Sequence, residues 1–454
     1  MLPYIFKRVL YFIPTCFFIS LIIFFLSKAA GEYLRCESDP NGPDLEICKA
    51  EAREKGYDKP IFYITFSTTA HPDTLYKVFR EERRNALTGL IGQYGNWPQI
   101  NHYYQQLLQL EDELSRLGET VSSNGLTTMQ KAVGQLVVKS KDKAISSQLK
   151  KLEKAAQAPS LTQLAPKIAA LTDTYTQIKA EATPQLLWIP AINWYGFDNQ
   201  YHFWITNFLK GDFGISHSNY QPVADVILDK LPWTLYINIP AIIIAYLLSV
   251  PLGVYSAVNK GSKVDKFISG SLLLLYSLPV FWVGTMLVNF FTTPEYGMKV
   301  FPSINFSASD SMGENIARLM LPIACVTYGA LAFMTRQVRS SMIETLQADY
   351  IRTARAKGLP ERSVVWKHAF KNALFPLITL FGSVFPAAFA GSVIVEIIFN
   401  ITGMGWLLLK SIQSTDWPVV YAILMISAVL TMIGLLIADI LYVVADPRVR
   451  LGKK

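Results

Sequence analysis

The sequence has little charge for its length. Of its 454 residues only 17 % are Asp, Glu, Lys or Arg, against about 25 % in an ordinary soluble domain, whereas 51 % are hydrophobic and 13 % aromatic. This composition excludes a disordered protein and a freely soluble basic nucleic-acid-binding protein, and it favours a protein embedded in a bilayer. The net charge of +8 is weak evidence for nucleic acid as a partner, because the cytoplasmic loops of membrane proteins collect Lys and Arg.

Cysteines and enzyme motifs are also scarce. Four cysteines are too few for a disulfide scaffold, although Cys36 and Cys48 share one polar segment and could form a disulfide in an oxidising compartment. No further Cys or His lies at zinc-ligand spacing from this pair. The sequence lacks the phosphate-binding loop, the His-Glu-x-x-His pattern and the Gly-x-Ser-x-Gly nucleophile elbow. We therefore expect no catalytic residues, no metal site and no directly bound cofactor.

Apolar runs long enough to cross a bilayer, roughly 20 residues each, are abundant. Six runs qualify, at about residues 9–29, 234–258, 267–291, 317–335, 374–398 and 419–445. The first run could be a cleaved signal peptide, with Ser27 and Ala29 as a weak cleavage pattern, but its apolar core is longer than a signal needs. Prolines interrupt several runs, which a helix bundle tolerates when neighbours satisfy the freed carbonyl groups.

Basic residues are concentrated in alternate loops. Residues 259–266 hold three lysines against one aspartate, residues 336–371 hold eight basic against three acidic residues, and residues 448–454 hold four basic residues. The positive-inside rule then predicts that both termini are cytoplasmic and that the segment between the first two spans lies outside.

The predicted outer segment has its own helical patterns. Apolar residues recur at helical spacing over residues 161–178, over 107–117 and from 129 towards 152, with prolines between or beside these stretches. We expect an all-α integral membrane protein with six transmembrane helices and an extracytoplasmic helical domain between helices 1 and 2. The predicted domains are residues 1–30, 31–231 with an insertion at about 61–194, and 232–454 with a cytoplasmic loop at 336–373.

The loop at 336–373 contains the most informative motif. Helix-forming residues from Glu344 end at Gly358, a good C-terminal cap, and Pro360 could open the next helix. The predicted helix, turn and helix form an amphipathic element that could bind lipid or a partner. An ordinary basic cytoplasmic loop is the alternative.

Several motifs resemble one family. Asp349-Tyr-Ile-Arg-Thr-Ala-Arg-Ala-Lys-Gly-Leu359, followed by Asn372-Ala-Leu-Phe-Pro376, resembles the coupling loop of binding-protein-dependent ABC permeases, and specifically the dipeptide/oligopeptide permease family. Arg352 stands where the general permease loop has a Glu, which is usual in the peptide branch. Further matches lie at residues 56–60, 211–214, 231–234, 251–253, 391–405 and 442–448. The resemblance covers residues 1–60 and 195–450, and residues 61–194 have no counterpart in a typical member.

The resemblance implies the transmembrane subunit of an ATP-driven importer in the bacterial inner membrane, with peptides as the substrate class. The family also includes importers of nickel, glutathione and other small solutes. The implied partners are a second homologous permease, two ABC ATPase subunits that bind ATP and Mg, an extracytoplasmic solute-binding protein and the lipid bilayer, with no nucleic acid. The chain itself would not be an enzyme.

The resemblance also implies functional residues. In this family the short cytoplasmic helix fits a groove of the ATPase subunit, and the corresponding residues here are Asp349, Tyr350, Arg352, Thr353, Ala354, Arg355, Ala356, Lys357 and Gly358. Candidates for the translocation path are Phe281, Trp282, Phe385 and Glu396. Intramembrane acids suggest function, but hydration near an interface, and aromatic packing between helices, are alternative roles for these four.

Two other classes of protein are alternatives. A gradient-driven carrier is disfavoured by six spans without charged residues clustered at the midplane. A membrane-anchored receptor or tether that works through its outer domain stays open. The insertion could dock the solute-binding protein, pack on the partner permease, or be a passive addition.

Overall fold

The computed structural model describes residues 2–29, 50, 53, 56–78, 80–118, 124–158, 161–293, 295, 297–298, 300–302 and 312–445. The chain forms two compact units: a membrane unit, Met1–Glu32 with Phe208–Lys454, and an insert unit, Tyr33–Asn207. Cys36 and Cys48 lie outside the described residues, and so do residues 446–448 of the predicted motif at 442–448.

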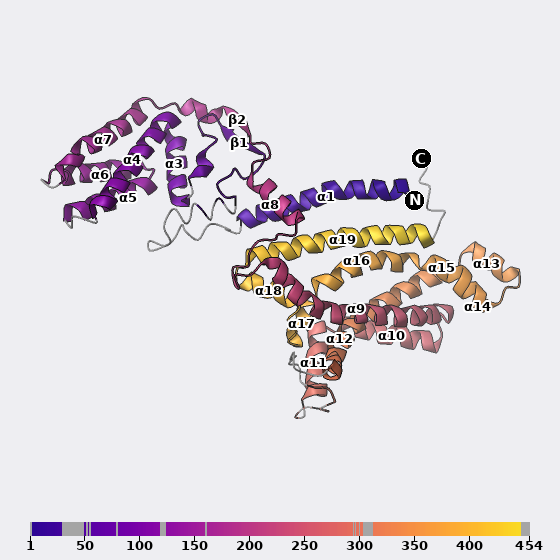
Figure 1. The fold of residues 1–454 in the computed structure, drawn as a ribbon. Coiled ribbons are helices and arrows are strands. Elements are labelled where there is room, and N and C mark those ends of the chain that lie inside the picture. Colours follow the sequence, from indigo (N-terminus) through magenta and orange to yellow (C-terminus); the bar gives the residue numbers. More distant parts are fainter. Residues whose placement is uncertain are drawn as a thin grey trace. The chain divides into compact units, whose positions relative to one another are not determined.

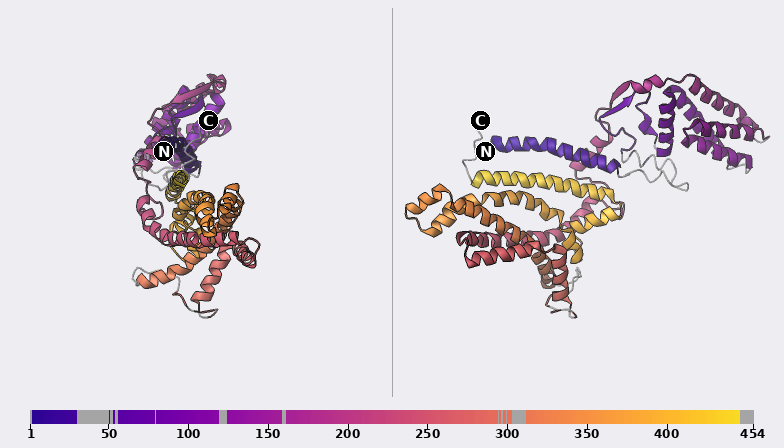
Figure 2. Two further views of the ribbon diagram at one scale, coloured as in Figure 1. Left: turned by 90° about the vertical axis from the view of Figure 1, so that its right-hand side faces the viewer. Right: turned by 180° about the vertical axis from the view of Figure 1, so that it is seen from behind.

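The membrane unit is helical. Its described residues contain five helices long and apolar enough to cross a bilayer, or six if one bent pair is counted as a single span. The five are α1 (Leu2–Ala29), α9 (Val223–Val258), α12 (Met312–Leu346), α16 (Phe375–Ala390) continued by α17 (Val393–Ile398), and α19 (Trp417–Ala445). Helices α1, α19 and α16 lie side by side (Figures 1 and 2). The predicted all-α membrane fold is confirmed.

The third predicted span, residues 267–291, is not one straight helix. It consists of α10 (Lys263–Ser277) and α11 (Val280–Thr292), which meet at 94°. Leu278 and Pro279 adopt extended backbone angles at the bend, because proline lacks an N–H donor and disfavours a helical residue before it. The Tyr328 hydroxyl donates to the Leu278 carbonyl at 3.0 Å, so part of the interrupted backbone is satisfied by α12.

Residues 208–231 belong to the membrane unit, whereas the predicted outer segment, residues 31–231, included them. Helix α9 begins at Val223, eleven residues before the predicted span. The turn before it is held by Asp416, whose carboxylate accepts hydrogen bonds from the Ser216 hydroxyl at 2.5 Å and the His217 N–H at 2.9 Å. This contact joins the turn to the loop between α18 (Met404–Gln413) and α19.

The insert unit is a helical bundle closed by two strands. Strand β1 (Ile64–Thr68) pairs antiparallel with β2 (Pro190–Trp194), in a register from Ile64 opposite Trp194 to Thr68 opposite Pro190. Between the strands lie η2 (Leu75–Lys77), α3 (Glu81–Tyr94), α4 (Trp97–Gly118), α5 (Asn124–Val138), α6 (Asp142–Ala155), η3 (Thr162–Leu164), α7 (Ala165–Ala180) and η4 (Pro184–Trp188), and α8 (Gln200–Leu209) follows them. The strand pair therefore joins the two ends of the predicted insertion.

The predicted apolar stripes of the insertion form its core. Leu107, Met129, Ile145 and Ile168, one each from α4, α5, α6 and α7, are all at most 1 % exposed. Two details differ from prediction. The stretch from 129 to 152 is divided into α5 and α6, and Leu161 with Leu164 precedes α7 rather than lying in it. The two strands were not predicted.

Candidate functional site: a clamped cytoplasmic helix

Helix α13 (Asp349–Ala356) follows α12 after a two-residue break. Its inward face is apolar: Ile351 is fully buried and Ala354 is 8 % exposed. Both pack in one cluster with side chains from four neighbouring segments. These partners include Val254 and Ala257 of α9, Val338 and Met342 of α12, Val364, Val365, Ala369 and Ala373 of the following helix, and Leu377 of α16. One eight-residue helix thus shares a core with several membrane helices.

The end of α13 is a Schellman turn. Gly358 has φ +73°, its N–H donates to the Arg355 carbonyl at 2.9 Å, and the Leu359 N–H donates to the Ala354 carbonyl at 3.4 Å. This is the pattern in which a left-handed residue closes a helix. Pro360 then sits at the N-cap of α14 (Glu361–Ser363). The predicted helix, tight turn and helix are present.

Polar contacts fasten α13 to the helix after the turn. The Arg355 guanidinium donates to both oxygens of Glu361, at 2.6 and 3.2 Å. This pairing lowers the pKa of the Glu361 carboxyl below its usual value and raises that of Arg355. Near the other end of α13, the Asn372 side chain donates to the Tyr350 hydroxyl at 2.6 Å. We call these two contacts, with the Gly358 turn, the α13 clamp.

The helix after the turn contains a π-helical segment. Residues Val364–Ala369, labelled η5, continue α14 and lead into α15 (Phe370–Ala373) and α16. Such segments are rare and are often found at functional sites. The sequence indicated a helix here but carries no signal that distinguishes its π-helical part. Val364, Val365 and Ala369 of this segment are buried against α13.

The outward face of α13 carries most of the predicted coupling residues. Tyr350 is 45 % exposed, and Asp349, Arg352, Thr353, Arg355, Ala356, Lys357 and Gly358 are also exposed. Ala354 alone of the predicted set faces inward. Two further exposed apolar side chains, Leu359 of the turn and Trp366 of η5, were not predicted. We call the exposed residues Tyr350, Arg352, Thr353, Ala356, Lys357 and Leu359 the α13 face.

A buried ion pair lies on the same core. Asp265 at the start of α10 is 3 % exposed, and Arg339 of α12 donates to its two oxygens at 2.7 and 2.8 Å. The Ser256 hydroxyl and the Gly261 N–H also donate to this carboxylate, at 2.5 and 2.8 Å. Sequence reasoning missed the pair, although Ser262 and Asp265 have the spacing of a capping box. The pair connects the ends of α9 and α10 to the part of α12 that leads into α13.

Residues 249–451, which contain the α13 clamp and the Asp265–Arg339 pair, match the family of binding-protein-dependent transport system inner membrane components. The oligopeptide transport system permease protein AppB of Bacillus subtilis (strain 168) is 40 % identical over 256 residues, 55 % of this chain and 79 % of that protein. The dipeptide transport system permease protein DppB of Lactococcus lactis subsp. cremoris (strain MG1363) is 35 % identical over 263 residues, 57 % and 83 % of the two chains. Its namesake in Escherichia coli (strain K12) is 36 % identical over 273 residues, 55 % and 80 %.

This chain belongs to that permease family. The resemblance to dipeptide and oligopeptide ABC permeases, inferred from motifs, is confirmed, and the chain is a multi-pass inner-membrane component. The insertion at 61–194 lies outside the region that matches the family.

In this permease, Glu396 is an internal structural group. It is 1 % exposed and accepts hydrogen bonds from the Thr234 hydroxyl at 2.9 Å and the Trp406 N–H at 2.8 Å. Gly391, Gly403 and Gly405 pack so closely around it that a Cβ on any of them would lie within 3.2 Å of the carboxylate. Glu396 thus ties α17 to α9 and α18, and it is not open to a solute in this conformation.

The three aromatic path candidates lie on two different helices. Phe281 and Trp282, at the start of α11, are 58 % and 45 % exposed. Phe385 is half-buried in a row with Phe381 and Phe389 along α16, with ring centroids 6.0 and 5.2 Å apart. Among the described residues, no three His, Cys, Asp or Glu side chains gather as a metal site.

Proposed function

We propose that this chain is a transmembrane subunit of an ATP-driven importer for peptides, in which the α13 face binds an ABC ATPase subunit. The observation that carries the proposal is the placement of α13: this short helix has an exposed face on one side and shares a core with α9, α12 and α16 on the other. The peptide substrate class is inferred from relatives that are named as oligopeptide and dipeptide permeases.

The clamp suits the transmission of movement. An isolated helix of eight residues would be unstable in water, so α13 keeps its shape through Ile351, Ala354 and its polar contacts. A displacement imposed on the α13 face would therefore move the helices that share its core. The Asp265–Arg339 pair would carry the same displacement to α10.

The proposed assembly contains a second homologous permease, two ATPases that hold ATP and Mg, and an extracytoplasmic solute-binding protein. The chain itself would hydrolyse no ATP. The distribution of Lys and Arg among the loops supports cytoplasmic termini and an extracytoplasmic insert. Within the proposed domains, residues 232–454 form the permease core, and 336–373 form its coupling loop.

Co-purification of the tagged protein in mild detergent tests the proposal. Gly358→Val places a β-branched side chain at φ +73°, which opposes the turn although no atom lies within 4 Å of the added Cβ. We expect the wild type to retain ATPase subunits and a second permease, and the variant to lose the ATPases.

Gly196→Val is the matched control, because Gly196 has φ +63° but lies in the insert unit. It should retain the ATPases. Wild-type protein that purifies alone would contradict the importer and favour a receptor or tether. Retention of ATPases by Gly358→Val would contradict the assignment of α13.

A further inference from the structure

The insert unit contains a cavity of about 370 Å³ between η2, the start of α3 and one face of α4. This volume lies within the roughly 300–1,000 Å³ typical of small-molecule sites. From α4 it is lined by Trp97, Asn101, Tyr104, Gln105 and Leu108, whose spacing places them on one side of a helix. The cavity is formed within the insertion, which the family match leaves out.

The charged groups of the cavity all have one sign. Lys77, Arg80 and Arg83 line it, and no carboxylate does so among the described residues. Arg83 is paired with Glu111 at 2.8 Å. No carboxylate of the described chain lies within ion-pair distance of Lys77 or Arg80, so two positive charges are left available to an anion.

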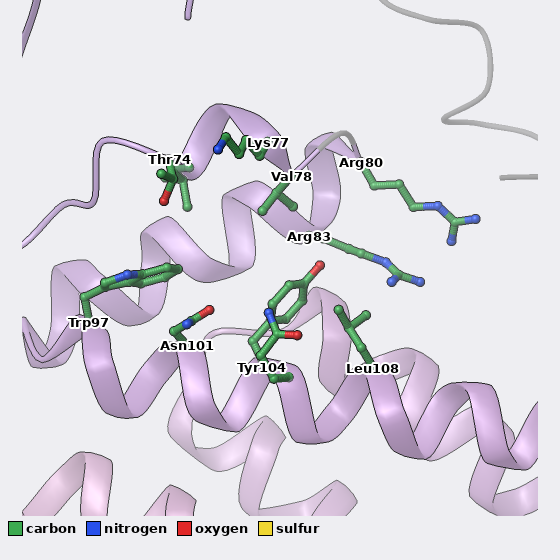
Figure 3. Close-up of a pocket in the computed structure, with 11 residues that line it drawn as sticks. Thr74, Lys77, Val78, Arg80, Arg83, Trp97, Asn101, Tyr104 and Leu108 are labelled. Carbon is green, nitrogen blue, oxygen red and sulfur yellow. The ribbon is translucent and has the colours of Figure 1, made fainter. Parts of the chain in front are cut away.

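The neutral groups of the lining suit the rest of a peptide. Trp97 lies at one end of the cavity, whereas the Arg80 and Arg83 side chains lie at the other, with Asn101 and Tyr104 between them (Figure 3). An indole ring provides a flat apolar surface for a side chain, and the Asn101 amide can both donate to and accept from a peptide group. An inorganic anion would use only the basic end.

We propose that this cavity binds the carboxyl-terminal end of a peptide. Arg80 holds the terminal carboxylate, Asn101 and Gln105 bond to the adjacent peptide group, and Trp97 contacts an apolar side chain. This inference rests on the proposed function for its choice of peptides as ligands, but it gives the insertion a role of its own, as a peptide site separate from the membrane helices.

Isothermal titration calorimetry on the purified full-length protein tests the site. The probe is Ala-Ala-Phe with a free carboxylate, and the comparison is the same peptide with a carboxamide. Because charge-assisted hydrogen bonds are the strong ones, we expect the amide to bind at least about tenfold more weakly. Arg80→Gln should weaken binding of the free acid by a similar factor.

Arg116→Gln is the matched control for charge, because Arg116 belongs to the same unit, has a 78 % exposed side chain and does not line the cavity. It should bind the peptide as the wild type does. Trp97→Ala, with far-UV circular dichroism to verify folding, should remove the preference for Ala-Ala-Phe over Ala-Ala-Ala. Asn101→Ala, which removes a side chain that the proposal places on the peptide group, provides a second variant if Arg80→Gln fails to fold.

Equal affinities of the wild type and the folded Arg80→Gln or Asn101→Ala variants would overturn the site. Inorganic phosphate that competes as well as the peptide would reduce the cavity to an anion site and overturn the peptide assignment. Either result leaves ATPase co-purification unaffected, whereas loss of co-purification in the wild type would overturn the importer without changing the titration. The two proposals therefore fail separately.

Discussion

The insert core and the α13 clamp hold helices in place in different ways. The helices α4, α5, α6 and α7 have 14 to 22 residues each and share a large apolar core. Helix α13 has 8 residues, two inward side chains and a few polar contacts. Stability therefore depends mainly on the insert core, and the proposed coupling depends on α13. Substitutions in the insert core should lower stability more than coupling, and substitutions at α13 should lower coupling more than stability.

The largest loss of stability is expected in the insert core. Leu107→Ala removes a side chain that is 1 % exposed, and the cavity left behind should cost about 4 kcal/mol. Thermal unfolding followed by circular dichroism should show the loss, while ATPase co-purification stays at the wild-type level. Simultaneous loss of the ATPases would show that the two units are not independent.

The second-largest loss of stability is expected at the buried ion pair. Arg339→Met leaves the carboxylate of Asp265 buried without its main partner, and such losses cost roughly 3–5 kcal/mol. We expect about 3 kcal/mol, because the Arg339 side chain is 29 % exposed and water can compensate in part. The double variant Asp265→Asn, Arg339→Met should recover part of the loss in the same unfolding assay. Equal stability of the single and double variants would contradict the pairing.

A substitution at Gly358 should lower stability less than the substitutions in the insert core or in the buried ion pair. Gly358→Ala requires a left-handed alanine, at a penalty of about 1 kcal/mol, and it adds a methyl group with open space around it. Uptake in proteoliposomes with the partner subunits should nevertheless fall severalfold. Normal uptake would show that coupling does not depend on the geometry of this turn.

The smallest stability effect is expected at Glu361. Its ion pair with Arg355 is about half exposed, so Glu361→Gln should cost no more than about 1 kcal/mol while weakening ATPase retention. Asp229→Asn is the control, because Asp229 is 70 % exposed, pairs with Lys230 at 2.7 Å and lies in the membrane unit outside α13. Glu361→Gln should retain less ATPase than the control variant. Equal retention by the two variants would contradict the importance of the clamp.

The same pair predicts a pH dependence. The pKa of Glu361 is lowered from 4.5 by Arg355, so the pair's stabilisation is complete above pH 4.5 and is lost as pH falls through the lowered value. ATPase retention should therefore be constant from neutral pH down to about pH 5. Below pH 4.5, protonation of Glu361 should lower ATPase retention by the wild type. The Glu361→Gln variant should not show this part of the decline.

The sequence predicted features that local patterns determine. Gly358 and Pro360 indicated the turn, because their backbone preferences act within a few residues. The apolar spacing at Ile168, Leu171 and Ile178 likewise identified core positions of α7.

Contacts between distant segments were not predictable in the same way. The Asp265–Arg339 pair joins residues 74 positions apart. The strands β1 and β2 form only because the ends of the insertion meet. The sequence predicts that prolines interrupt several apolar runs, but the 94° bend at Pro279 depends on how α11 packs against α12 and α17. Glu396 was a path candidate as an intramembrane acid. The glycines around it come from two places in the chain, Gly391 before α17 and Gly403 with Gly405 at the start of α18.

Photo-crosslinking tests the central claim, that the α13 face binds the ATPase, most directly. A photoreactive residue replaces Lys357, which is exposed on that face, and in a second protein it replaces Lys210, which is exposed elsewhere in the membrane unit. We predict a crosslink to the ATPase subunit from position 357 and none from position 210. No ATPase crosslink from position 357, with the complex intact, would contradict the account.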